Sequence, residues 1–186
     1  MAKKGEITTT EPLRTKEQID NMMNAIPAGR DRMLFLIGIN SALRVSDLVK
    51  LRVSDFDFSE GRIIVREQKT GKAKNHLLHP LVAEKLHQFI LNRGLKDYIF
   101  CSQKGGHIST QRVRYIITKA AEVCGYKHIS THTMRKTFGY QAWKAKQPFP
   151  LIMAAFNHVD PKVTKRYLGI QQDDLDGMTS SLHFGI

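Results

Sequence analysis

The hydrophobic pattern of this chain changes its period twice, and these changes constrain the fold more than any other feature. Apolar residues recur at helical spacing over residues 16–51 and again after residue 80. Residues 56–65 and 75–79 read instead as short strands, with Gly71 in the turn between the last two strands. We therefore expect an α+β domain that is mainly α-helical, with a small three-stranded antiparallel sheet interrupting the helices.

Local signals indicate where several helices begin and end. Thr15 and Gln18 resemble a capping box, which starts a helix that Pro27 should end. The segment from Arg30 to Asn40 is apolar on nearly every side, which predicts a central, buried helix. Further helices are expected over residues 45–51, 81–91, 109–124, 131–144, 148–156 and 160–169.

Length and cysteine usage indicate one domain in a reducing compartment. Residues 1–12 are polar and should form a loose arm, while residues 13–186 are long enough to bury a core. Cys101 and Cys124 lie far apart with no CxxC motif, which argues against a disulfide framework or a zinc finger. No apolar run approaches the roughly 20 residues that cross a bilayer, and no secretory signal opens the chain. We expect a cytoplasmic protein without a membrane partner.

The charge balance favours a polyanionic partner. The chain has 29 Lys and Arg residues against 17 Asp and Glu, which gives a formal net charge of +12. Each phosphate that a Lys or Arg neutralises releases condensed counterions, so such an excess of charge fits a phosphate-rich partner. The alternative is a basic surface that only keeps the protein soluble.

Two pairs of residues could act on a phosphate group. His132 and Arg135 stand three apart on an expected helix and project from one face, where imidazole can move a proton and guanidinium can grip phosphate oxygens. Arg44 lies where one apolar helix ends and the next begins, and Asp47 could orient its charge. The alternatives are a solvated helix face for the first pair and an ion pair that only orders the turn for the second.

Three further residues are candidates for chemistry. Lys69 sits at the tip of the expected hairpin, from which it could donate a proton to a leaving oxygen, although such a lysine is usually just solubilising. His158 is followed nine residues later by Tyr167, near the end of a short capped helix. The alternative for Tyr167 is a core or rim aromatic whose hydroxyl group binds water.

The order and spacing of these groups resemble the catalytic domain of the tyrosine recombinases, the phage integrase family. The likeness covers residues 13–170 and rests on the segment Ala42-Leu43-Arg44-Val45-Ser46-Asp47-Leu48, a lysine on a hairpin, the motif H-x-x-R, a histidine and a final tyrosine. It implies a site-specific DNA recombinase in which Tyr167 attacks a DNA phosphate and forms a 3′-phosphotyrosyl intermediate. The enzyme would need neither a metal ion, nor ATP, nor any other cofactor.

The resemblance also implies a role for each residue. Arg44 and Arg135 would hold the non-bridging phosphate oxygens, and His158 would hydrogen-bond the same oxygens. Lys69 would protonate the 5′ leaving oxygen, and His132 would act as a base or positioner near Tyr167. Asp47 would help to hold these side chains in position without contacting the phosphate itself. The implied partners are double-stranded DNA, further copies of the chain in a tetramer on DNA, and accessory DNA-bending proteins, with the enzyme associated with the nucleoid.

The sequence departs from the family pattern at several points. Asn157 stands where the family often has glycine, and asparagine is the non-glycine residue that best tolerates left-handed backbone. Lys136 replaces a histidine that often follows H-x-x-R, a change that we expect to matter little. Family members commonly carry a separate N-terminal DNA-binding domain, and the 14 residues before Thr15 are too few to form one.

Other classes of protein fit less well. A type IB topoisomerase uses similar chemistry, but the short hairpin and the Arg44 segment are more integrase-like. A non-catalytic DNA-binding regulator of this fold should have lost Tyr167 or an arginine, and a phosphate-binding protein or zinc enzyme lacks acidic or thiol partners for His132 and His158. The target DNA sequence and the direction of recombination cannot be read from these residues.

The end of the chain changes character after the tyrosine. Residues 171–176 contain three aspartates and no basic residue, so this acidic stretch should face away from DNA. Met178, Leu182 and Phe184 then offer apolar anchors, and we expect them to bury part of their surface in a groove of the same or a neighbouring protomer. The alternative is a frayed terminus. If the anchors bind in this way, deletion of residues 171–186 should alter assembly on DNA.

Overall fold

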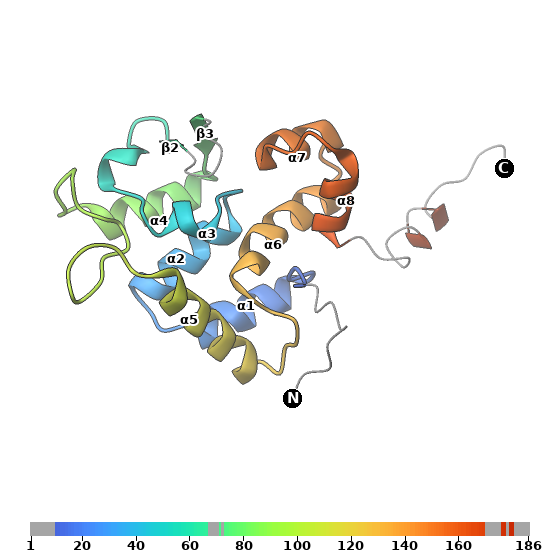
Figure 1. Ribbon diagram of the computed structural model, residues 1–186, viewed down its shortest axis with the longest axis horizontal. Coiled ribbons are helices and arrows are strands. Elements are labelled where there is room, and N and C mark those ends of the chain that lie inside the picture. Colours follow the sequence, from blue (N-terminus) through green and yellow to red (C-terminus); the bar gives the residue numbers. More distant parts are fainter. Residues whose placement is uncertain (1–9, 67–70, 72, 170–175, 178, 181–186) are drawn as a thin grey trace.

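The computed structural model describes residues 10–66, 71, 73–169, 176–177 and 179–180 (Figure 1). Its elements follow the order α1 Lys16–Ala25, α2 Arg30–Ile39, α3 Val45–Leu48, the 3-10 turn η1 Val53–Asp55, β1 Phe56–Asp57, β2 Arg62–Arg66, β3 Ala73–Leu77, α4 Pro80–Ile90, α5 Thr110–Val123, α6 Thr131–Lys144, α7 Phe149–Phe156 and α8 Pro161–Leu168. The predicted helical α+β class and the interrupting sheet are confirmed. Within these ranges, no helix combines the length and apolarity that crossing a bilayer requires.

Side-chain caps start the helices where the sequence predicts. The amide of Gln18 donates to Thr15 Oγ1 over 3.1 Å, and Gln18 Oε1 accepts from the Thr15 amide, which completes the capping box. Ser109 caps α5, and Asp160 Oδ1 accepts from the Lys162 amide in the first turn of α8. These caps satisfy amides that have no partner within the helix, so they stabilise the starts of α1, α5 and α8.

The sheet is antiparallel with the order β1-β2-β3 (Figure 1). Its register pairs Ile63 with His76 and Val65 with Lys74. Side chains alternate between the two faces of a strand, so His76 and Lys74 lie on the same face as the buried Ile63. The strand β3 therefore directs two basic side chains toward the interior of the domain.

The helix α2 forms the centre of the main core. Leu34, Phe35 and Ile37 are fully buried, and the helix contacts α1, α3, α4 and α6. A Cβ atom at Gly38 would lie 2.5 Å from Met134 Sδ, so α2 and α6 approach more closely there than any larger residue allows. The predicted central helix is confirmed.

The helices α7 and α8 pack on the other end of α6 around a second core. Its buried members are Ala42, Ile152, Phe156 and Leu168. Figure 1 shows these two helices side by side at the end of α6, on the side away from α1 and α5. A Cβ atom at Gly139 of α6 would lie 2.4 Å from Phe156 and 2.7 Å from Leu168, so the absence of a side chain lets both helices approach α6.

The last three residues of the expected loose arm, Thr10, Glu11 and Pro12, contact the rest of the domain. Residues 1–9 lie outside the described part, but Thr10, Glu11 and Pro12 run along α6. The amide of Glu11 donates to the His128 carbonyl over 2.8 Å, and Thr133 Oγ1 donates to the Glu11 carbonyl over 2.9 Å. The backbone groups of this polar segment find partners on α6 and on the loop before it, which its composition does not reveal. The tail residues Met178, Leu182 and Phe184 lie outside the described residues.

Gly139→Ala should destabilise the protein by roughly 1–3 kcal/mol, because the added methyl group overlaps Phe156 and Leu168. At a solvent-exposed position of a helix the same change would instead stabilise the protein by about 0.5–1 kcal/mol. The sign of the change in unfolding free energy therefore shows whether the space at Gly139 is filled. The measurement is the free energy of unfolding from urea denaturation. An unchanged or increased stability would contradict the close approach.

Candidate active site

The helix α6 carries two of the predicted residues on one face. Ser130 caps the helix, and His132 and Arg135 follow one turn apart. Arg135 is only 3% exposed, and its Nη2 donates a 2.8 Å hydrogen bond to the Phe156 carbonyl. A buried guanidinium needs such hydrogen bonds, because they offset the free energy that is lost when the charge is removed from water. The predicted helix face is therefore partly interior and not a solvated surface.

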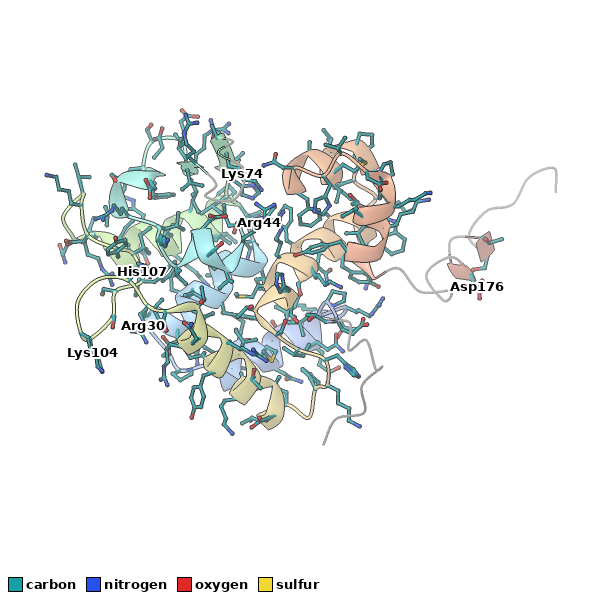
Figure 2. All side chains as sticks on the ribbon, in the orientation of Figure 1. Arg30, Arg44, Lys74, Lys104, His107 and Asp176 are labelled. Atoms are coloured by element: carbon teal, nitrogen blue, oxygen red, sulfur yellow. The ribbon has the colours of Figure 1, made fainter. Side chains whose placement is uncertain are left out.

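The turn between α2 and α3 presents Arg44. This residue precedes α3 with extended backbone and is half-buried, and its carbonyl accepts a 3.0 Å hydrogen bond from the Asp47 amide. Asp47 itself is buried on α3. Figure 2 shows Arg44 close to Lys74 in the middle of the molecule, between β3 and the pair α7 and α8.

A left-handed turn after α7 places His158. Asn157 adopts φ 55° and ψ 37°, so the predicted replacement of glycine by asparagine at a left-handed position is confirmed. The His158 ring stacks on Phe156 at 5.2 Å between centroids, and its Nδ1 lies 3.1 Å from Thr164 Oγ1. Because Thr164 belongs to α8, this contact joins the histidine to the helix that carries Tyr167.

Tyr167 lies among these groups. Its ring centroid is 5.1 Å from that of Phe156 and 5.5 Å from that of His158. The Cζ atom of Arg135 lies 5.9 Å from the same centroid. The charges of Arg44 and Arg135 act on both Tyr167 and His132, so these four residues and His158 come together from four separate segments of the chain.

The electrostatics of the site favour the neutral forms of Tyr167 and His132. Burial raises the pKa of Tyr167 above its usual value, and the charges of Arg135 and Arg44 oppose this only in part. Partial burial lowers the pKa of His132, and the positive charges of Arg135, Lys136 and Arg44 lower it further. A neutral imidazole can accept a proton, which the neutral phenol of Tyr167 must lose to become a nucleophile.

Two lysines that the sequence analysis did not assign also reach the site. Lys74 is 7% exposed, and its Nζ donates to the carbonyls of Ala42 over 3.2 Å and Ala155 over 2.5 Å. Its inward direction follows from the strand alternation only once the register that pairs it with Val65 is known. Lys136 Nζ lies 5.5 Å from the Tyr167 ring centroid, so the residue that replaces the family's histidine has contacts that the motif did not predict.

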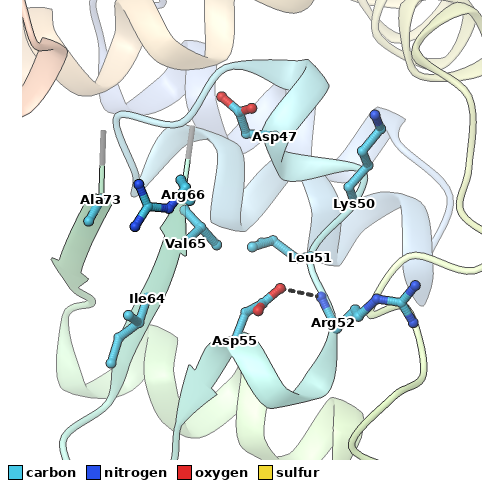
Figure 3. Close-up of a pocket in the computed structure, with 9 residues that line it drawn as sticks. All are labelled: Asp47, Lys50, Leu51, Arg52, Asp55, Ile64, Val65, Arg66 and Ala73. Carbon is cyan, nitrogen blue, oxygen red and sulfur yellow. Dashed lines mark hydrogen bonds between the residues drawn. The ribbon is translucent and has the colours of Figure 1, made fainter. Parts of the chain in front are cut away.

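The predicted proton donor, Lys69, lies outside the described residues. Beside the strands that flank it, a hollow of about 440 Å³ opens between α3, η1 and β2 (Figure 3). Asp47 lies at its upper rim, Arg66 at its side and Leu51 at its floor. Among the described residues, no three His, Cys, Asp or Glu side chains gather as a metal site.

Comparison with known proteins defines the class. The phage integrase family profile matches residues 13–173. The chain is 32% identical over 166 residues to the probable integrase/recombinase YoeC of Bacillus subtilis (strain 168), which covers 88% of this chain and 91% of YoeC. The chain belongs to the phage integrase family, the tyrosine recombinases.

Solved structures share the fold. The crystal structure of XerA recombinase superposes with a TM-score of 0.79 at 19% identity, over 97% of this chain and 66% of that one. XerH site-specific recombinase, bound to a palindromic difH substrate, gives a TM-score of 0.75 at 19% identity, over 93% of this chain and 52% of that one. This chain therefore spans about half to two thirds of the length of these two recombinases.

An NMR titration should give His132 a pKa below the 6.5 of an ordinary histidine, because partial burial and three nearby cations disfavour its protonated form. Arg44→Gln removes one of those cations and should move this pKa upward. A wild-type midpoint at or above 6.5, or a downward shift in the variant, would contradict the arrangement.

Proposed function

We propose that this protein is a site-specific DNA recombinase that cleaves and rejoins DNA strands through a 3′-phosphotyrosyl intermediate at Tyr167. The observation that carries the proposal is the placement of Tyr167 beside the guanidinium of Arg135, with Arg44, His132 and His158 around the same point. Two guanidinium groups beside a phenol can hold a phosphate diester while the phenol oxygen attacks it.

Cleavage exchanges one phosphodiester for another. The Oη atom of Tyr167 forms a bond to phosphorus as the bond from phosphorus to the 5′ oxygen breaks. The phenol proton passes to the neutral imidazole of His132, and Lys69 supplies the proton that the leaving 5′ oxygen needs. Rejoining is the same step in reverse with a 5′ hydroxyl of another strand, so the energy of the diester is kept and no ATP is consumed.

The cations stabilise the charge that grows on phosphorus oxygens in the transition state. Arg44 and Arg135 bind the non-bridging oxygens, and His158, fixed by Thr164, donates a hydrogen bond to them. These groups supply the positive charge that a divalent metal provides in other phosphoryl-transfer enzymes, so the reaction proceeds without one. Asp47, buried at the other end of the α3 turn, supports the orientation of Arg44.

The net charge of +12 supports double-stranded DNA as the partner. XerH site-specific recombinase, which shares this fold, is bound to its difH substrate in the solved structure, and this supports DNA as the partner here. Recombination joins strands from two duplexes, so we propose that copies of the chain assemble on DNA as a tetramer, with accessory DNA-bending proteins as further partners. The enzyme would act in the cytoplasm, at the nucleoid.

The test is covalent capture from a randomised pool of nicked duplexes. In such duplexes the short cleaved fragment diffuses away, so the adduct of protein and DNA accumulates and can be trapped with detergent and sequenced. Wild-type protein should give an adduct that selects one sequence, and Tyr167→Phe should give none while binding the selected duplex as tightly. An adduct that persists in Tyr167→Phe would refute the assignment of the nucleophile.

Positively charged residues inside and outside the site should differ in their effect on the rate of adduct formation. Arg44→Ala and Arg135→Ala should each slow adduct formation by about 10²–10³-fold, as the loss of one donor to a transition-state oxyanion typically does. Lys16→Ala, at an exposed position on α1, serves as the matched control and should change the rate little. If Arg44→Ala forms the adduct at the wild-type rate, Arg44 only orders its turn.

A further inference from the structure

We propose that Arg14 is a positioning residue for the nucleophile: it reaches from the segment before α1 to the C-terminal end of α8 and holds Tyr167 beside Arg135. The proposal rests on the function proposed above for its catalytic consequence. The contact itself belongs to the fold and can be tested without DNA.

The Arg14 guanidinium bridges three features. Its Nη2 donates a 2.5 Å hydrogen bond to the Gly169 carbonyl and lies 3.3 Å from Glu11 Oε2. Its Cζ lies 4.8 Å from the centroid of the Tyr140 ring on α6. An arginine held by a carboxylate and a ring has few accessible positions, so the hydrogen bond to Gly169 constrains where the end of α8 lies.

The end of α8 is the place where such a constraint acts on the nucleophile. The helix has eight residues, and Gly169 follows it with φ 63°, only two residues after Tyr167. The last carbonyls of a helix have no amide partner within it and carry partial negative charge, so a cation there is favourable. Release of the Gly169 carbonyl would free the turn that includes Tyr167.

The segment that carries Arg14 is itself anchored to α6. The amide of Leu13 donates to Thr137 Oγ1 over 2.9 Å, and Gln141 Nε2 donates to the carbonyls of Leu13 and Arg14 over 3.0 and 3.2 Å. Because α6 also carries Arg135, the chain of contacts from α6 through Arg14 to Gly169 sets the separation between Arg135 and Tyr167.

A second contact of the same segment reaches the nucleophile. Lys136 Nζ donates a 2.6 Å hydrogen bond to the Thr10 carbonyl and lies 5.5 Å from the Tyr167 ring centroid. The segment Thr10–Arg14 thus borders Tyr167 through Lys136 and borders the end of its helix through Arg14. Both contacts depend on residues that precede the first helix.

The first experiment measures amide hydrogen exchange in α8, without DNA. Arg14→Met should lower the protection of the amides of residues 162–168 by about tenfold, because a hydrogen bond from a charged donor is lost. The matched control is Arg32→Met, which also removes guanidinium bonds to main-chain carbonyls, those of Ile26 and Asn24, far from α8. Wild-type protection of α8 in Arg14→Met, or an equal loss in Arg32→Met, overturns the proposal.

The second experiment measures the rate of adduct formation on the selected nicked duplex. Arg14→Met should lower the rate constant at saturating DNA while the dissociation constant stays at its wild-type value, and Arg14→Lys should restore part of the rate because an ammonium can still donate to Gly169. Arg32→Met should match the wild type once both are compared well below their melting temperatures. A loss confined to DNA affinity, or an equal rate loss in Arg32→Met, refutes the positioning role.

The two experiments separate the two proposals. If the wild type yields no adduct from the randomised pool while exchange in α8 rises only in Arg14→Met, the proposed function fails and the contact stands. If the wild type forms the adduct and Arg14→Met exchanges and cleaves like it, the function stands and Arg14 has no positioning role.

Discussion

The hydrogen bond from Arg135 to the Phe156 carbonyl is the interaction on which the rest of the site depends. It places a cation inside the protein at the C-terminal end of α7, where Lys74 also donates to Ala155. Backbone carbonyls at a helix end carry partial negative charge, so they help to stabilise two buried cations at this point. The positive charge is then available to a phosphate, and α6, β3 and α7 are joined at the same point.

Much of the fold could be predicted from the sequence because its signals are local. The capping box at Thr15, the cap at Ser109 and the left-handed Asn157 depend on residues within four positions of each other, and all three are confirmed. The change of hydrophobic period located the sheet, and the family motif predicted residues that the structure brings together. Their individual roles stay predictions.

The contacts that could not be predicted from the sequence join residues that are distant in the chain. Lys74 reads as a solvated strand lysine until its partners, the carbonyls of Ala42 and Ala155, are known. The polar segment before α1 reads as a loose arm, yet residues 10–14 bond to a helix more than 120 positions later. Backbone carbonyls accept hydrogen bonds whatever their side chains are, so no residue pattern marks them as partners.

The shortness of α8 affects which part of the protein unfolds first on heating. A helix of eight residues is too short to persist in water by itself, and α8 is held by the Thr164 contact to His158, the buried Leu168 and the bond from Arg14. The core around α2 buries many more side chains than the contacts of α8 do, so we expect α8 to open at a lower free energy than the whole domain. Heating should therefore separate Tyr167 from Arg135 and His158 while the main core around α2 is still folded.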